Sequence, residues 1–185
     1  MKIEELEIKG CWLLTSSLFN DERGSFREWF SFKRIFDETS FRFETAQSNI
    51  SKSKKGALRG MHYSLAPVGQ SKIITCAHGS IVDVVVDIRP TSKTYKKWIS
   101  VDLTGSEAKS ILIASGLAHG FLSLEDGSVV TYQQTSRYSP SEEFGINPFD
   151  PEIGVIWPYS SPILSDKDAM SINLSEAEKL GILPS

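Results

Sequence analysis

The chain has 185 residues, 40% of them hydrophobic and 23% charged, and this length suits one well-packed domain. Its formal net charge is −3 and its lysines and arginines are scattered, which argues against a nucleic-acid-binding or anionic-membrane-binding surface. Cys11 and Cys76 are too few for a disulfide framework and lack metal-ligand spacing, so we expect a reducing, cytoplasmic location. The acidic N-terminus and the short apolar runs predict neither export nor a membrane span.

Short β-strands dominate the predicted elements. Turn sequences such as DERG at residues 21–24 recur at strand-length intervals, and β-branched or alternating apolar patterns occupy residues 73–76, 80–88 and 97–103. Many short strands at this spacing favour a sandwich, a jelly roll or a closed barrel.

Two short helices are predicted, over residues 31–38 and residues 175–180. The second carries a capping-box pattern of Ser175 with Glu178. The proline-containing residues 138–163 are expected to run as an ordered segment over the β domain. The sequence therefore predicts one β domain, residues 1–185, with a few peripheral helices.

Polar residues alternate along one predicted strand. Gln47, Asn49 and Ser51 have a period of two, so a strand directs all three to the same face. That face is either the solvent side of an edge strand or the wall of a polar cavity.

The segment GALRGMHYS, residues 56–64, places a cation and an imidazole in an otherwise apolar strand. Arg59 and His62 differ in parity, so regular alternation directs them to opposite faces. A glycine inside a strand often marks a bulge, and a bulge at Gly60 would turn both side chains toward one cavity. Taken alone, His62 is better explained as a core or surface histidine than as a functional one.

Further polar residues occur in strands that are otherwise apolar: Lys72, His119, Tyr132 and Tyr138. Burying such groups without partners costs about 1–3 kcal/mol each, and a polar cavity that holds a ligand explains them together. The histidines His62, His78 and His119 lack a His-x-His pair and predict no metal site, and no Gly-x-Ser-x-Gly elbow is present. The pattern indicates acid–base chemistry on a ligand whose phosphate Arg59 and Arg23 bind.

Several segments occur together in a distinctive order and spacing. They are DERGSFRE at 21–28, QSN at 47–49, LRGMHY at 58–63, QSK at 70–72, DVVVDIR at 83–89, AHGF at 118–121, residues 132–140, Asp150-Pro151, Trp157-Pro158 and LSDKDA at 164–169. In this combination the chain resembles the dTDP-4-dehydrorhamnose 3,5-epimerase family over about residues 6–170.

The resemblance implies a double-stranded β-helix of cupin (jelly-roll) type, here an all-β single domain, that works as a homodimer. It implies a nucleotide-diphosphate sugar substrate, a dTDP-4-keto-6-deoxyhexose, and no metal or organic cofactor. A hydrogen on a carbon next to a ketone is acidic because the carbanion delocalises as an enolate. Epimerisation therefore needs a base on one face of the sugar and an acid on the other.

The resemblance also implies roles for individual residues. His62 would be the base, Asp168 would fix its tautomer, Tyr132 would be the acid, and Lys72 would stabilise the enolate oxygen. The residues implied for substrate binding are Gln47, Asn49 and Arg59 at the pyrophosphate or sugar, His119 and Tyr138 at the site, and Arg23, Phe26 and Glu28, which would reach the nucleotide in the partner subunit's site. Phe26 is equally well explained as core, and Glu28 as a solvated charge.

Three departures from the family pattern lie beside these residues: Ser64 in place of glutamine, Gln133 in place of lysine, and Ala114-Ser115 in place of a proline. They leave the substrate open, so a single-carbon epimerase acting on a CDP- or GDP-linked sugar is an alternative. A keto-isomerase of the same fold and a non-catalytic sugar-nucleotide-binding cupin are two further alternatives. Retention of the base, its carboxylate partner, the acid and the lysine favours epimerisation.

Overall fold

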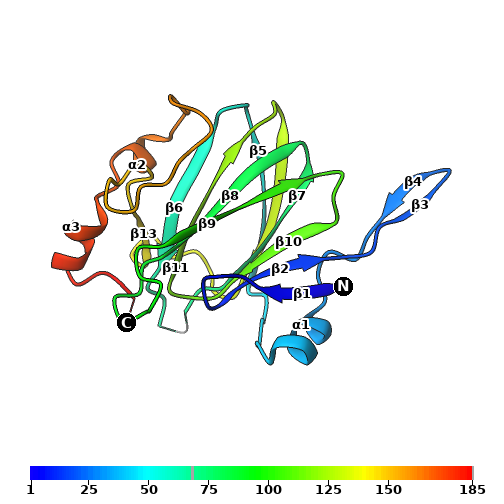
Figure 1. Ribbon diagram of the computed structural model, residues 1–185, viewed down its shortest axis with the longest axis horizontal. Helices are drawn as coiled ribbons and strands as arrows, with labels where there is room; N and C mark the ends of the chain where they lie inside the picture. The colour runs from blue at the N-terminus through cyan, green and yellow to red at the C-terminus, as the bar shows by residue number, and fades with distance from the viewer. Residues whose placement is uncertain (68, 185) are drawn as a thin grey trace.

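Two antiparallel sheets face each other in the computed structural model, which describes residues 1–67 and 69–184 (Figure 1). The larger sheet contains, in spatial order, β1 (Lys2–Glu5), β2 (Cys11–Thr15), β10 (Lys109–Ile113), β7 (Lys72–His78), β12 (Ser128–Gln134) and β5 (Gln47–Ser53). The smaller sheet contains β13 (Glu143–Gly145), β6 (Leu58–Ser64), β11 (Leu117–Ser123), β8 (Ser80–Asp87) and β9 (Trp98–Thr104). This arrangement is a jelly roll of cupin type, which confirms the predicted fold class.

A separate two-stranded sheet lies outside the two larger sheets. Strands β3 (Phe19–Asp21) and β4 (Gly24–Phe26) form a hairpin around the predicted 21–24 turn. Figure 1 shows this hairpin projecting away from the rest of the chain.

Period-two patterning determines which side chains enter the space between the sheets. On β8, Ile81 and Val85 belong to the inner core, whereas Val84 and Val86 belong to a cluster on the outer face of the smaller sheet. Strand β8 is buried on both faces, because the larger sheet packs on its inner face and the C-terminal segment with Leu174 and Ala177 packs on its outer face. Its nearly continuous apolar run follows from this central position.

Each sheet is covered over part of its outer face. Helix α1 (Phe32–Thr39) buries Ile35 against the larger sheet. The segment after β12 covers the smaller sheet and includes Trp157, whose Nε1–H donates to the carbonyl of Pro148 at 2.9 Å. The expected ordered segment over residues 138–163 is therefore present. None of the helices in the described residues has the length and apolar character that a membrane crossing requires.

The helices at the C-terminal end differ in part from the prediction. Helix α2 (Asp166–Ala169) was not predicted, and helix α3 (Leu174–Lys179) begins one residue before the predicted start. The assignment of Ser175 as the cap was wrong: Asn173 is the N-cap, and its backbone N–H donates to Glu176 Oε2 at 2.9 Å. Two capping patterns overlap in this sequence, and burial of Leu174 selects the earlier one.

Candidate active site

A cavity of about 290 Å³ lies between the sheets. Strands β5, β6, β7, β11, β12 and β13 and helix α2 all contribute side chains to it. Among the residues predicted from sequence, those that line it are Gln47, Arg59, His62, Lys72, His119, Tyr132, Tyr138 and Asp168. The polar cavity inferred from misplaced polar residues is therefore present.

A bulge in β6 brings Arg59 and His62 to this one cavity. His62 pairs with His119 of β11, and Arg59 pairs with Phe121, so β6 has one more residue than β11 between the two pairs. Both polar side chains line the cavity. The predicted departure from alternation at Gly60 is confirmed.

Only glycine fits at the bulge. Gly60 has a φ of 124°, and a Cβ placed there would lie 2.6 Å from the Cα of Gly120 on β11. Beyond the bulge the strand resumes its alternation, so Leu58 and Met61, three residues apart, both enter the outer core. The extra residue at Gly60 lets Arg59, before the bulge, and His62, after it, both point inward.

His62 is held by a buried carboxylate. Its Nε2 lies 2.6 Å from Asp168 Oδ1, and the backbone N–H of Gly60 donates to Asp168 Oδ2 at 3.5 Å. Burial acts to raise the pKa of Asp168, but hydrogen bonding and charge from His62, with smaller contributions from Ser165 and Gly60, outweigh it and lower the pKa. The carboxylate accepts from Nε2–H, which leaves the Nδ1 lone pair of His62 free for another partner.

Lys72 and Tyr132 lie on the opposite wall. They come from the neighbouring strands β7 and β12 of the larger sheet, whereas His62 comes from the smaller sheet. Burial, followed by the charge of Glu143, raises the pKa of Tyr132, so its phenol stays protonated at neutral pH. Burial lowers the pKa of Lys72, and the charges of Glu143 and Asp83 oppose that change.

The predicted polar face of β5 points inward. Gln47 lines the cavity, donates through Nε2 to Asn49 Oδ1 at 2.8 Å, and accepts the backbone N–H of Tyr138 at 2.9 Å. Strand β5 is an edge strand, as the alternative interpretation held. Its solvent face is the other one, on which Ile50 is 75% exposed.

Asn49 accepts a hydrogen bond from Gln47 but is not among the residues that line the cavity. Three other predicted binding residues lie outside the cavity of their own chain. Arg23 and Phe26 belong to the projecting hairpin, where Arg23 pairs with Asp21 at 2.5 Å and Phe26 is 69% exposed. Glu28 follows the hairpin, and its Oε1 lies 3.4 Å from Arg34 Nε.

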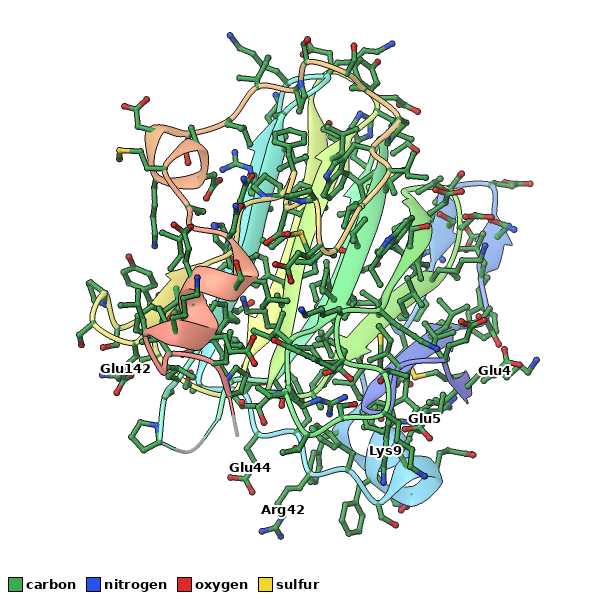
Figure 2. The ribbon with its side chains drawn as sticks, turned by 60° about the vertical axis from the view of Figure 1, so that its left-hand side comes forward. Glu4, Glu5, Lys9, Arg42, Glu44 and Glu142 are labelled. Atoms are coloured by element: carbon green, nitrogen blue, oxygen red, sulfur yellow. The ribbon has the colours of Figure 1, made fainter. Side chains whose placement is uncertain are left out.

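Sequence reasoning missed three charged residues of this region. Asp83 Oδ2 lies 2.7 Å from His119 Nε2, Glu143 lines the cavity, and so does Lys167 of α2. A signal existed for Asp83, since it is the only charged residue in the apolar run 81–86. Glu143 had none, because it opens a three-residue strand after a loop; Figure 2 shows its neighbour Glu142 at the outer edge of the molecule.

Comparison with known proteins agrees with this architecture. The sequence model of the family described as dTDP-4-dehydrorhamnose 3,5-epimerase matches residues 5–176. The dTDP-4-dehydrorhamnose 3,5-epimerase of Mycolicibacterium smegmatis is 41% identical over 100% of this chain and 91% of its own length.

Solved structures give the same result. The rmlC epimerase of Mycobacterium tuberculosis has a TM-score of 0.97 and 39% identity, covering 100% of this chain and 94% of that one. ChmJ, a 3'-monoepimerase from Streptomyces bikiniensis in complex with dTDP-quinovose, has a TM-score of 0.93 and 38% identity, covering 97% of this chain and 91% of that one. The chain with the His62–Asp168 pair therefore belongs to the dTDP-4-dehydrorhamnose 3,5-epimerase family of carbohydrate epimerases.

Proposed function

We propose that this chain inverts C3, C5 or both of a dTDP-linked 4-keto-6-deoxyhexose by removing and returning a proton. The observation that carries the proposal is the placement of His62, held by Asp168, on one wall of the cavity and Tyr132 on the opposite wall. Inversion needs a base and an acid on opposite faces of the sugar, and this pair supplies them.

The steps follow from the chemistry of the groups. Nδ1 of His62 takes the proton next to the ketone, and the electron pair moves onto the C4 oxygen as an enolate. The ammonium of Lys72 stabilises that negative charge in a site shielded from water. The phenol of Tyr132 then returns a proton to the other face of the carbon.

The remaining cavity residues, with Asn49 hydrogen-bonded to Gln47, bind the substrate. We assign the pyrophosphate or sugar to Arg59, whose guanidinium suits phosphate oxygens, together with Gln47 and Asn49. Tyr138 and His119 line the same space. The dTDP-quinovose bound to the ChmJ relative supports a dTDP-linked sugar as the ligand.

We propose further that the chain is a homodimer in which the β3–β4 hairpin completes the partner subunit's site. Support comes from the exposure of Phe19 and Phe26, at 62% and 69%, on a hairpin that projects from the chain. Arg23 at its turn would then reach the nucleotide phosphates, with Glu28 nearby.

Incubation with dTDP-4-dehydro-6-deoxyglucose in D2O tests the enzyme assignment. We expect deuterium at C3, C5 or both, and NMR of the product identifies the inverted carbon. Faster labelling of a CDP- or GDP-linked 4-keto sugar would favour the alternative nucleotide, and a moved carbonyl would indicate a keto-isomerase. No label in any of the three substrates would leave only a sugar-nucleotide-binding protein.

Alanine substitution of two different histidines tests the role of His62 and supplies a matched control. The His62→Ala variant should bind dTDP and lose exchange, because it lacks the base. His78→Ala should exchange like the wild type, since His78 is exposed at the end of β7. Exchange retained in His62→Ala would remove His62 from the base role.

A further inference from the structure

A second histidine–carboxylate pair lies beside the His62–Asp168 pair. His119 pairs with His62 across the neighbouring strands β11 and β6, and its Nε2 lies 2.7 Å from Asp83 Oδ2. Asp83 comes from β8 and is fully buried. Each imidazole at this wall therefore has its own carboxylate, and the proposed steps use only one of the two.

Asp83 decides which ring nitrogen of His119 faces a ligand. A carboxylate only accepts hydrogen bonds, so Nε2 of His119 carries the hydrogen directed at Asp83. The other ring nitrogen, Nδ1, has no hydrogen-bond partner within residues 1–67 and 69–184, and His119 lines the cavity. Nδ1 is therefore the ring atom available to a sugar hydroxyl.

Asp83 also acts on Lys72, which lies on the facing sheet. Oδ1 of Asp83 is buried without a hydrogen-bond partner in the part of the chain that the structure describes. Burial raises the pKa of Asp83, and the charges of His119 and Lys72 oppose that change. The Asp83 charge in turn supports the ammonium of Lys72, as does Glu143 of β13, whereas Lys167 of α2 acts against it.

We propose that Asp83 is a positioning residue of the epimerisation. It orients His119 so that Nδ1 accepts a hydrogen bond from a sugar hydroxyl, and it keeps Lys72 charged beside the C4 oxygen. The inference rests on the proposed function and adds to it a residue that touches no substrate. A single buried carboxylate thereby serves one binding group and one catalytic group.

The isosteric variant Asp83→Asn tests the proposal. Its amide donates to Nε2 of His119 and supplies no negative charge. We expect kcat for deuterium exchange to fall about 100-fold or more, with a smaller change in KM. The alkaline limb of the pH profile should move down by about one pH unit or more, because Lys72 loses a counter-charge.

Asp87→Asn is the matched control. Asp87 lies on the same strand and is equally buried, but it pairs with Arg89 at 2.8 Å and does not line the cavity. Its kcat and alkaline limb should match those of the wild type. Equal losses in the two variants, or an Asp83→Asn enzyme with wild-type kcat and pH profile, would overturn the proposal.

The wild-type protein provides a test that does not depend on the variant folding. The chain has three histidines, so proton–nitrogen-15 correlation spectra, assigned with a His119→Gln variant, report the tautomer of each. We expect neutral His119 to carry its hydrogen on Nε2, and a hydrogen on Nδ1 overturns the proposal. Absence of exchange in the wild type would instead refute the proposed function, and the spectra would still decide the orientation of His119.

Discussion

Replacing Asp168 by asparagine substitutes an NH2 group for one carboxylate oxygen and keeps the shape of the side chain. In the wild type, Nε2–H of His62 donates to Asp168 Oδ1 at 2.6 Å, and the lowered pKa of Asp168, in which the His62 contacts outweigh burial, keeps this group a carboxylate at neutral pH. The asparagine amide instead donates to Nε2, so the imidazole hydrogen moves to Nδ1. The lone pair assigned to proton abstraction then no longer faces the substrate.

The expected loss is large because the substitution changes the tautomer of the base. The equivalent aspartate-to-asparagine change in a serine protease triad lowers kcat about 10⁴-fold, which corresponds to about 5 kcal/mol of activation free energy. We expect the same order here, since the Asp168 side chain is 6% exposed and water has little access to replace its oxygen. The free energy of unfolding should fall less, by about 1.5–3 kcal/mol, for one hydrogen bond to a charged group.

The assay is deuterium incorporation into dTDP-4-dehydro-6-deoxyglucose in D2O, followed by NMR. Asp166→Asn is the matched control: Asp166 begins the same short helix, is exposed, and should change the exchange rate by about twofold at most. Asp168→Asn exchanging within about tenfold of the wild type would refute the assignment of His62 Nδ1 as the base. An equal loss in Asp166→Asn would show that the charge of the helix, and not the tautomer, matters.

Four further outcomes follow from the same geometry. Tyr132→Phe removes the phenolic proton, so deuterium exchange should continue while inversion falls about 10²- to 10⁴-fold; NMR of the product checks this, and inversion at the wild-type rate would contradict it. Burial lowers the pKa of Lys72 from its ordinary 10.5, so kcat should decline with rising pH before pH 10.5 is reached, and a pH–rate profile that stays level to that point would exclude an ammonium role. Gly60→Ala places a Cβ 2.6 Å from backbone of β11 and should lower the free energy of unfolding by about 1–3 kcal/mol; an unchanged melting temperature would argue against the bulge. Burial acts to raise the pKa of Asp87, but hydrogen bonds from Arg89 and its neighbours lower it to about 2, so about 2 kcal/mol of stability present above about pH 4 should be lost as the pH falls toward 2, and urea unfolding of Asp87→Asn should lack that dependence.

Local patterns in the sequence were sufficient for much of the fold and part of the site. Period two in β8 predicted its strand, and the same period in Gln47 and Asn49 predicted a shared polar face, because alternation along a strand is a property of the backbone alone. Gly60 predicted the bulge for a similar reason, since a glycine between Arg59 and His62 marks a local break in alternation.

Contacts between residues that lie far apart in the sequence could not be predicted from local patterns. Asp83 was visible as a charge in an apolar run, but its partner His119 lies 36 residues away and was found only from the packing of β8 against β11. Glu143 enters the cavity because β13 pairs with β6, a contact that no local pattern encodes. The predicted N-cap of α3 was wrong because Asn173 with Glu176 and Ser175 with Glu178 both have capping-box spacing. The structure uses the earlier pattern, and Leu174 is buried in the first turn of the helix.

The sequence by itself determined that this protein consists mainly of short strands and that Gln47, Asn49 and Ser51 share one face, and it determined the family through the order of its motifs. The tertiary structure decided that Nε2 of His62, and not Nδ1, faces Asp168, 106 residues away, and that the Arg23 hairpin lies outside its own chain's cavity. The physical reason is that alternation depends on neighbouring residues, whereas the partner of a buried charge depends on which strands the whole chain brings together.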